Sequence, residues 1–548
     1  MATYATDLTD LNTAESVTGW AELTNYASGG SNVLDGENFI QGSDCISQTT
    51  GQKSGAVFSI AYDNGSAITW TTGEVFLVWQ YYAIGANLAS YANGGMRVGV
   101  FSSLTAGDIF YTGGSDRAPY PAGAWQNIAI DPENTTHETT DGGGNGGSYR
   151  YISSMLNTLV KVTKGNPHAC DCIRYGRGEI YCTGTGANFT GMAQENDYND
   201  NTNGYHRWGL LSDTGGGTFL WKGLMSLGQS GTSTTFSDSN KTIVIDDAAK
   251  TYLDFNKIEI NNASSDISWT NISFAPLGTT SPGQLEVIDN ATVAMTGCIF
   301  NNMDTFGFLS NSDIESCTFN TCKQITTGGA NMLGSNILES SVAADTGAIY
   351  QNVAYTDTYL DSMTFSKGTN AHHAIDFGTA VTSNLTLRNI EFTDFGSTDD
   401  SNDSTIRFLA TSGSLTLSLI GCTVNGSVAS TSNFSIDDAA GITVTLSIDP
   451  VDINITVLDV EKNAIENAQV GVFLLDSPFT ELMNEDSAAG TGLATESYGG
   501  SLPVDIKWRV RKSDTLDDPR YKAQSGTGEI TSNGFNLTVT LIEQPLPI

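Results

Sequence analysis

The chain has 548 residues, and single hydrophobic cores stop growing near roughly 250 to 300 residues, so its length predicts more than one domain. Lys and Arg number 24 against 60 Asp and Glu, which gives a formal net charge of −36. A surface of that sign repels phosphate backbones and anionic bilayers, so we expect neither nucleic-acid binding nor membrane insertion. Only 15% of the residues are charged while Gly alone contributes 59, a balance typical of turn-rich β structure.

The first ten residues contain neither the basic segment nor the apolar segment of a secretory signal, so we expect synthesis in the cytoplasm. The longest apolar runs, such as 75–79 and 470–475, are far shorter than the roughly 20 residues that span a bilayer. Eight cysteines are too sparse for a disulfide framework and fit a reducing compartment. A viral particle component, built in the host cytoplasm and released by lysis, would combine this extracellular style of composition with the missing export signal.

Residues 1–235 predict an N-terminal β-sandwich of jelly-roll or lectin type. Short β-like runs at 74–82, 96–101 and 125–130 are separated by turns rich in Gly, Ser and Asp. One helix is expected at 151–162, because apolar side chains recur there every four residues.

Residues 236–448 contain an internal repeat, which predicts a right-handed parallel β-helix. A six-residue pattern occurs seven times: an apolar residue, any residue, then Asn, Gly or Ser, a small or apolar residue, any residue, and an apolar residue. The third residue tolerates the left-handed backbone conformation, so we expect the chain to bend there at one corner of each coil. The predicted corner residues are Asn271, Gly297, Ser316, Ser335, Ser362, Asn389 and Gly421.

Residues 449–548 predict a small β-sandwich, because four segments alternate between apolar and polar residues. Within it, the stretch 456–470 resembles the first hairpin of carboxypeptidase-regulatory-like, immunoglobulin-type modules. That resemblance implies a spacer or adhesive module. This chain has Asn463 and Ala464 at the turn, where those families usually carry Gly and Pro.

The order of the three regions resembles structural proteins of tailed phages, especially phages of marine bacteria. In these an N-terminal sandwich is followed by a β-helix and an immunoglobulin-like module. The resemblance implies a virion part without a catalytic motif, and it leaves open whether that part sits on the head or on the tail. It is carried by the stretches 91–100, 123–132, 164–168, 173–180 and 258–265.

Three cysteines, Cys298, Cys317 and Cys422, share the fourth position of the repeat, so we expect free thiols stacked inside the β-helix. His168 with Cys170, Cys172 and Cys182 has the atom types of a zinc site, but only one residue separates Cys170 from Cys172, whereas paired ligands of structural zinc sites are usually separated by two to four residues. We therefore expect no metal there. The redox state of the three thiols is left open, including a disulfide from Cys182 to either of the others.

Two further motifs suggest metal ligands. Asp197, Asn199 and Asn201 place oxygen atoms at alternate positions, as in a calcium loop, yet the glycine and the final glutamate of such a loop are misplaced or missing. An Asx-rich surface turn is the favoured interpretation, with calcium of low affinity as the alternative. His372 and His373 are adjacent and would face opposite ways in a strand, so we expect turn histidines. No cofactor is expected.

We predict a non-enzymatic structural component of a phage particle, an elongated fibre, spike or head decoration exposed on the virion surface. It is expected to be a trimer that contacts capsid, portal or tail proteins and a host-surface glycan. The alternative is a polysaccharide-degrading tailspike, a glycoside hydrolase or lyase, with paired carboxylates in a groove and Tyr355, Tyr359 and Phe377 as a sugar platform. A bacterial surface adhesin is the third possibility. The catalytic candidates for a tailspike are Asp361, Asp376, Glu391 and Asp394.

Overall fold

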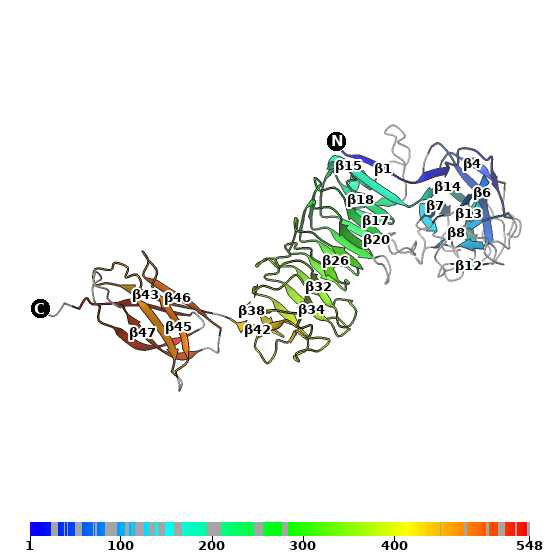
Figure 1. Ribbon diagram of the computed structural model, residues 1–548. Coiled ribbons are helices and arrows are strands. Elements are labelled where there is room, and N and C mark those ends of the chain that lie inside the picture. Colours follow the sequence, from blue (N-terminus) through cyan, green and yellow to red (C-terminus); the bar gives the residue numbers. More distant parts are fainter. Residues whose placement is uncertain are drawn as a thin grey trace. The chain divides into compact units, whose positions relative to one another are not determined.

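The computed structural model describes most of the chain (Figure 1). Apart from the five-residue helix α1 (Phe189–Ala193), every regular element in the described residues is a β-strand, which confirms the all-β class. By their internal contacts, the residues divide into two compact units, 1–353 with 363–376, and 354–362 with 377–548. The described residues are 1–23, 31–37, 39–40, 42–49, 57–69, 71, 74–82, 96–104, 109–111, 113–114, 125–130, 138–140, 148–157, 167–193, 210–245, 256–276, 283–449, 451–475, 479–499, 503–512, 521–531 and 534–544.

The first unit opens with an antiparallel sandwich. Its strands are β2 (Thr9–Asn12), β3 (Trp20–Ala21), β4 (Val33–Asp35), β5 (Cys45–Thr49), β6 (Val57–Thr69), β7 (Val75–Tyr82), β8 (Met96–Phe101), β9 (Ile109–Tyr111), β10 (Gly113–Gly114), β11 (Trp125–Ile130), β12 (Glu138–Thr140), β13 (Ser148–Asn157) and β14 (Pro167–Gly176). One sheet has the order β10-β8-β13-β6-β3, the other the order β11-β7-β14-β5-β4 with β2 on β14, while β9 and β12 form a separate pair. Side chains alternate along β7, so that Phe76 and Val78 enter the core between the sheets while Trp79 packs on the opposite face with Ile40 and Cys172.

The helix predicted at 151–162 is wrong, because residues 148–157 form strand β13, which pairs with β6 on one side and β8 on the other. The remaining positions, 158–162, lie outside the described residues. A spacing of four is also an even number, so Ile152 and Leu156 share one face of a strand as readily as one face of a helix. Both are fully buried in the sandwich core.

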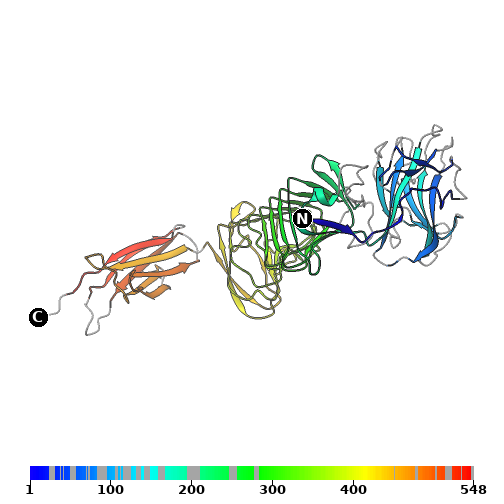
Figure 2. The same ribbon diagram turned by 90° about the horizontal axis from the view of Figure 1, so that it is seen from above.

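Parallel strands stacked in coils follow in the same unit, and we call this region the parallel stack (Figures 1 and 2). Its strands are β15 (Glu179–Ala187), β16 (Leu211–Gly215), β17 (Thr218–Trp221), β18 (Leu224–Leu227), β19 (Thr234–Ser239), β20 (Thr242–Ile245), β21 (Lys257–Ile260), β22 (Asp266–Thr270), β23 (Ser273–Pro276), β24 (Gln284–Val287), β25 (Thr292–Thr296), β26 (Ile299–Asn301), β27 (Thr305–Gly307), β28 (Ser312–Glu315), β29 (Thr318–Asn320), β30 (Ile325–Thr326), β31 (Asn336–Leu338), β32 (Gly347–Gln351), β33 (Thr364–Ser366) and β34 (His373–Phe377).

Strands that occupy the same place in successive coils pair in parallel, so each sheet grows by one strand per coil. The three rows run β18-β21-β24-β27-β30, β19-β22-β25-β28 and β20-β23-β26-β29. Parallel pairing begins at β15, earlier than residue 236, where we expect the second domain to start. An N-terminal strand, β1 (Thr3–Thr6), pairs antiparallel with β15, and β16 pairs antiparallel with β17.

A column of phenylalanines fills the interior of the stack. The parallel register places Phe274, Phe300 and Phe319 directly above one another, and all three are fully buried. Their rings are stacked, with centroids 5.3 Å apart for the first pair and 5.0 Å apart for the second. Phe306 meets both Phe300 and Phe319 edge-on. Offset and edge-on ring contacts of this kind add to the stabilisation that comes from burial alone.

Left-handed corners recur in the parallel stack and among the residues of the second unit. Six of the seven predicted corner residues have a φ between 53° and 64°, and the side-chain oxygen of Asn271 sits against the next corner glycine, Gly297. Ser335 is the exception, and the prediction is wrong by one position: Gly334 has the left-handed φ of 67°. Ser335 instead occupies the inward position, where its hydroxyl donates to the Ile314 carbonyl and accepts from the Cys317 N–H. The six are Asn271, Gly297, Ser316, Ser362, Asn389 and Gly421.

The second unit contains further parallel strands. They are β35 (Leu385–Arg388), β36 (Glu391–Thr393), β37 (Ile406–Phe408), β38 (Ser414–Ile420), β39 (Thr423–Val424), β40 (Ser427–Val428), β41 (Ile436–Asp437) and β42 (Thr443–Ile448). The parallel pairs are β35-β38-β42, β36-β39 and β37-β41, while β40 turns back antiparallel onto β39. Phe377 stacks on Phe408 with centroids 4.9 Å apart, so ring stacking continues in this unit.

A C-terminal sandwich completes the second unit. Its strands are β43 (Val451–Leu458), β44 (Gln469–Leu474), β45 (Glu481–Asp486), β46 (Leu493–Tyr498), β47 (Val504–Arg511), β48 (Gln524–Ile530) and β49 (Phe535–Thr540). One sheet has the order β46-β43-β49, the other β45-β44-β47-β48. Alternate residues of β44 and β47, among them Val470, Val472, Ile506 and Val510, are fully buried between the sheets. The residues between them therefore face outward, and they form the site described next.

Candidate functional site

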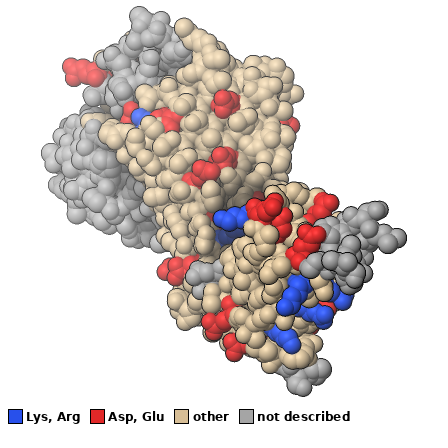
Figure 3. Space-filling view, turned by 90° about the vertical axis from the view of Figure 1, so that its left-hand side faces the viewer, with Lys and Arg blue, Asp and Glu red and all other residues tan. Residues whose placement is uncertain are grey.

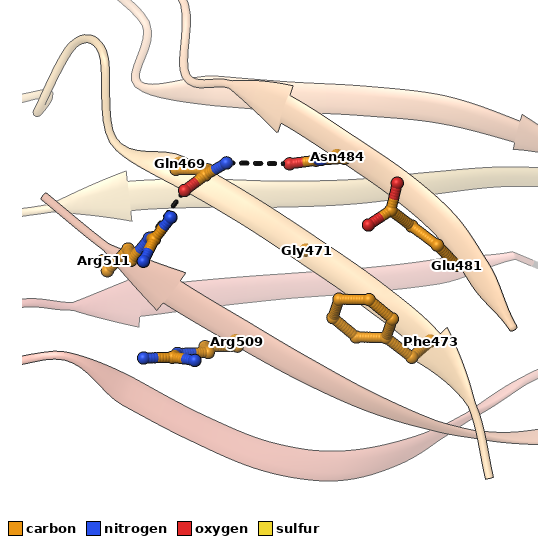
Figure 4. Close-up of a pocket in the computed structure, with 7 residues that line it drawn as sticks. All are labelled: Gln469, Gly471, Phe473, Glu481, Asn484, Arg509 and Arg511. Atoms are coloured by element: carbon orange, nitrogen blue, oxygen red, sulfur yellow. Dashed lines mark hydrogen bonds between the residues drawn. The ribbon is translucent and has the colours of Figure 1, made fainter. Parts of the chain in front are cut away.

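A groove lies on the outer face of the C-terminal sandwich, across strands β44, β45 and β47. Its lining residues are Gln469, Gly471, Phe473, Glu481, Asn484, Arg509 and Arg511, and Figure 4 shows them around a central hollow. The strand register explains why these residues lie together, because Gly471 is directly opposite Asn484 on one neighbouring strand and Arg509 on the other. One cross-strand row thus forms the middle of the groove.

Gly471 provides the floor of the hollow. This residue is buried in the centre of its sheet, and a Cβ placed on it would lie 2.9 Å from a ring carbon of Phe473. A side chain at this position would therefore push against the Phe473 ring and fill the groove. The hollow measures about 210 Å³, below the roughly 300 to 1,000 Å³ of sites that enclose a drug-sized ligand. It suits one unit of a longer ligand.

Three polar side chains form a hydrogen-bonded chain along one end of the groove. The Arg511 Nε donates to the Gln469 Oε1 at 2.6 Å, and the Gln469 Nε2 donates to the Asn484 Oδ1 at 3.0 Å (Figure 4). Each bond restrains long side chains before any ligand arrives. This end of the groove is therefore preorganised, which lowers the entropy cost of binding.

Two charged side chains of the groove have no side-chain partner among the described residues. Arg509 and Glu481 are both exposed, and neither forms a side-chain hydrogen bond or an ion pair there. Figure 4 places the two arginines on one side of the hollow, and Glu481 and the half-buried Phe473 ring on the other. The arrangement offers an apolar ring face, guanidinium donors and a carboxylate acceptor around one small space.

The carboxylates predicted as catalytic candidates have different surroundings. Asp376 is buried in the first unit, where its Oδ2 accepts the Gly347 N–H at 2.7 Å. Glu391 and Asp394 are exposed in the second unit, and the Asp394 backbone is left-handed with a φ of 67°. Asp361 is buried in the second unit and has the most developed set of contacts.

Arg388 and Tyr355 lie close to Asp361, which belongs to the turn 357–362. The Asp361 Oδ1 accepts the Arg388 N–H at 3.2 Å, and its Oδ2 lies 3.6 Å from the Arg388 Nη1. Burial raises the pKa of Asp361, although the Arg388 charge opposes that shift. Burial and the Asp361 charge also raise the pKa of Tyr355, whose hydroxyl lies 3.5 Å from the Thr386 carbonyl oxygen. The exposed Asp357 accepts the Thr386 N–H at 3.1 Å.

The aromatic platform predicted near these carboxylates does not form as expected. Phe377 is fully buried, with Phe408 stacked on it and Tyr355 meeting it edge-on at 5.9 Å. The stacking of successive coils places this ring in the interior rather than on the surface. Only Tyr355 and Tyr359 are partly exposed.

The histidines predicted to lie in turns are buried instead, because His373 begins strand β34 and His372 directly precedes it. The His372 Nδ1 donates to the His373 carbonyl at 2.8 Å, and its Nε2 accepts the Gly368 N–H at 3.1 Å. The His373 Nε2 lies 3.2 Å from an oxygen of Asp345. The calcium candidates Asp197, Asn199 and Asn201 lie outside the described residues.

All eight cysteines are free and buried, including Cys170, Cys172 and Cys182. Cys170 lies in the sandwich core and Cys172 on the opposite face. Alternate residues of a regular strand share one face, so this separation comes from the irregular pairing of β14 with β7 between Asp171 and Ile173, where Cys172 has a φ of 45°. Three repeat cysteines donate to carbonyls of the preceding coil: Cys298 to Trp269, Cys317 to Met295 and Cys422 to Leu387. These thiols behave as small buried side chains with one weak donor.

The sequence alone did not reveal the groove, because its residues come from three strands that are up to 42 positions apart, as in the Arg511 to Gln469 bond. The sequence does contain one signal that could have indicated the groove. Lys507, Arg509 and Arg511 alternate along one predicted strand, and Gly471 and Phe473 alternate along another. In the described residues, no helix is long and apolar enough to cross a membrane.

No protein-family model and no curated protein sequence matches the chain. Several solved structures are similar to it. They include the family 11 carbohydrate-binding module from Clostridium thermocellum in complex with a β-1,3-1,4-mixed-linked tetrasaccharide, with 12% identity and a TM-score of 0.20 over 31% of this chain and 94% of the module. An exo-β-agarase is similar with 12% identity and a TM-score of 0.21 over 31% of this chain, and the match spans 25% of the agarase.

The catalytic unit of the thermostable GH87 α-1,3-glucanase from Streptomyces thermodiastaticus strain HF3-3 is similar over 78% of this chain and 96% of the glucanase, with 10% identity and a TM-score of 0.17. The presence of agarases and a glucanase catalytic unit among these structures contradicts our prediction that the chain is not an enzyme.

Proposed function

We propose that the protein binds carbohydrate, and that the groove of the C-terminal sandwich holds one sugar unit of a polymer. The observation that carries the proposal is the combination around the hollow above Gly471 of the Phe473 ring with Arg509 and Glu481, whose side chains have no partner among the described residues. Sugar rings have an apolar face of C–H groups and a rim of hydroxyls. A partly exposed aromatic face with nearby donors and acceptors matches both.

Replacing Phe473 with alanine tests this proposal. We expect F473A to weaken binding of the recognised polysaccharide by about tenfold, because loss of a ring contact worth about 0.5 to 1.5 kcal/mol combines with loss of apolar area. Isothermal titration calorimetry with the full-length protein measures the change. Val460, exposed in the same sandwich and outside the groove, provides the matched control V460A, which should bind as the original protein does. Equal affinity of F473A and V460A would count against the groove.

The finer architecture is also a proposal. We propose that the parallel stack is a right-handed β-helix with flanking sandwiches, jelly-roll or lectin-like before it and immunoglobulin-like after it. The parallel rows, the left-handed corners and the two separate sandwich cores support this description. The antiparallel strands β16 and β40 support it further, because they pair with strand edges that would otherwise invite addition of another chain.

We further propose that the protein is a surface appendage of a phage particle, assembled in the host cytoplasm as a trimer, with carbohydrate of the host surface as its ligand. Mass spectrometry of purified particles should find the chain, and native mass spectrometry should give three times 58.0 kDa. A stable monomer that is absent from particles would contradict this proposal and favour a bacterial adhesin.

Cleavage of a glycan is a second candidate function, and the surroundings of Asp361 favour it. A carboxyl group whose pKa is raised by burial retains its proton closer to neutral pH, as a general acid requires. Arg388 and Tyr355 lie beside it and supply a cation and a hydroxyl. Together these groups provide acid chemistry and charge stabilisation at one place in the second unit.

The substitution D361N tests whether the protein cleaves a glycan. We expect D361N to lower the release of reducing ends or unsaturated sugars by at least about a hundredfold, because general acid–base groups contribute roughly 10²- to 10⁴-fold. Binding at the C-terminal groove should stay unchanged. E391Q is the control, since Glu391 is exposed and should be dispensable. Absence of glycan cleavage by the original protein, or full activity of D361N, would refute this candidate.

A further inference from the structure

Positive charges are scarce in this protein, and several of those that the structure describes are neutralised by a nearby carboxylate. Against a formal net charge of −36, only 24 residues are Lys or Arg. Six of them form ion pairs with carboxylates in the described residues. These are Arg150, Arg174, Lys241, Lys257, Lys323 and Arg388.

Strand β47 carries three cations that are not among these ion pairs. Lys507, Arg509 and Arg511 are exposed at alternate positions, so their side chains leave the same face of the sheet. None of the three forms an ion pair in the described part of the chain. Arg511 bonds the neutral Gln469, and the Lys507 ammonium lies over the Phe479 ring at 5.4 Å. Figure 3 shows Lys and Arg side chains gathered on the C-terminal sandwich.

We propose that the groove selects an acidic sugar, one that carries a carboxylate or a sulfate, with the Arg509 guanidinium as its anion-binding group. This inference rests on the proposed carbohydrate binding and names the class of sugar. A planar guanidinium matches the two oxygens of such a group and binds them through paired hydrogen bonds. Because Arg509 has no carboxylate partner among the described residues, no ion pair between those residues has to break first.

The opposite side of the groove determines the orientation of the ligand. Glu481 has no cationic partner in the described residues and faces the hollow across from the arginines (Figure 4). It repels an acidic group and accepts hydrogen bonds from hydroxyls. The sugar therefore binds with its acidic group toward β47 and its hydroxyls toward β45, while Phe473 contacts the ring.

The three cations of β47 attract an acidic ligand over a short range only. At physiological ionic strength charges are screened over about 8 Å, so the acidic remainder of the protein does not cancel a contact made inside the groove. At longer range the net charge of −36 repels densely charged polyanions. This difference favours an acidic polysaccharide over nucleic acid or an anionic membrane.

Matched pairs of soluble polysaccharides test the inference with the full-length protein. The pairs are polygalacturonate with its methyl ester, and κ-carrageenan with its desulfated form. We expect the acidic member of at least one pair to bind at least tenfold more tightly than its neutral partner, by calorimetry at 0.15 M salt. R509Q should abolish that preference, whereas K522Q, which removes an exposed charge elsewhere in the same sandwich, should preserve it.

The outcomes separate the two proposals. Equal binding of acidic and neutral members, or a preference that survives R509Q, overturns the acidic specificity and leaves carbohydrate binding intact. Failure to bind any member of either pair overturns the proposed function itself. Binding of duplex DNA or of phosphatidylglycerol vesicles with the same dependence on Arg509 also overturns the inference. The cations of β47 would then bind anions of any kind.

Discussion

Lowering the pH from 7 to 4.5 is expected to remove ~2.7 kcal/mol from the free energy of unfolding of the N-terminal sandwich through His168 alone. Burial lowers the pKa of His168 from 6.5 to about 3. Its Nε2 lies 2.7 Å from the Ser154 Oγ, and its Nδ1 has no hydrogen-bond partner in the described residues. A proton on this ring would place an uncompensated charge in the sandwich core.

The direction of the effect follows from which state binds the proton first. The unfolded chain takes it up near pH 6.5 and the folded protein only near pH 3, so the stabilisation is complete above pH 6.5. It is lost progressively as the pH falls between those values, at ~1.4 kcal/mol per pH unit.

Chemical unfolding at several pH values, followed by tryptophan fluorescence, measures this dependence. H168Q removes the titrating group, so the difference in stability between the original protein and H168Q should shrink with falling pH. His372, whose pKa burial also lowers, is present in both proteins and cancels in the comparison. A difference that stays constant from pH 7 to 4.5 would refute the assignment to His168.

Truncation of Phe319 to alanine is expected to destabilise the parallel stack by about 3 to 5 kcal/mol, the range for removing a large aromatic side chain from a packed interior. Phe319 is fully buried, stacks on Phe300 and meets Phe306 edge-on at 5.0 Å. Its removal leaves a cavity in a column whose backbone is held by parallel strands on both sides, so the surroundings cannot collapse into it.

Urea unfolding of F319A measures the cost. Ile299 provides a control, since it lies on a neighbouring strand of the same sheet but is 42% exposed. I299A should change stability by less than about 0.5 kcal/mol. If F319A costs no more than I299A, the phenylalanine column is not a packed core.

The repeat explains why much of the parallel stack can be predicted from sequence. Left-handed corners need residues that tolerate positive φ, and an inward residue must follow at a fixed offset, so both requirements leave a pattern in the sequence. The pattern fails by one position at Ser335, because Gly334 and Ser335 are both small and either fits the corner. Only the hydrogen bonds of Ser335 inside the stack distinguish the two.

Features that depend on contacts between distant segments could not be predicted in the same way. A spacing of four fits both helix and strand, so the positions of Ile152 and Leu156 led us to predict a helix where the chain forms strand β13. The groove depends on the register that puts Gly471 between Asn484 and Arg509, and sequence patterns fix strand positions without fixing their partners. The predicted carboxylates were chosen by proximity in the repeat, which says little about burial, as Asp361 and Glu391 show.

The buried sulfurs have a practical consequence for work with this protein. Because every thiol is shielded in the folded chain, thiol-reactive dyes should label it slowly under native conditions and rapidly after denaturation. Labelling kinetics would thus report opening of the first sandwich and of the coils separately, since Cys45 belongs to the first sandwich and Cys298 to the coils. The C-terminal sandwich contains no cysteine and would not be reported. Purification should need neither oxidative refolding nor a constant supply of reductant.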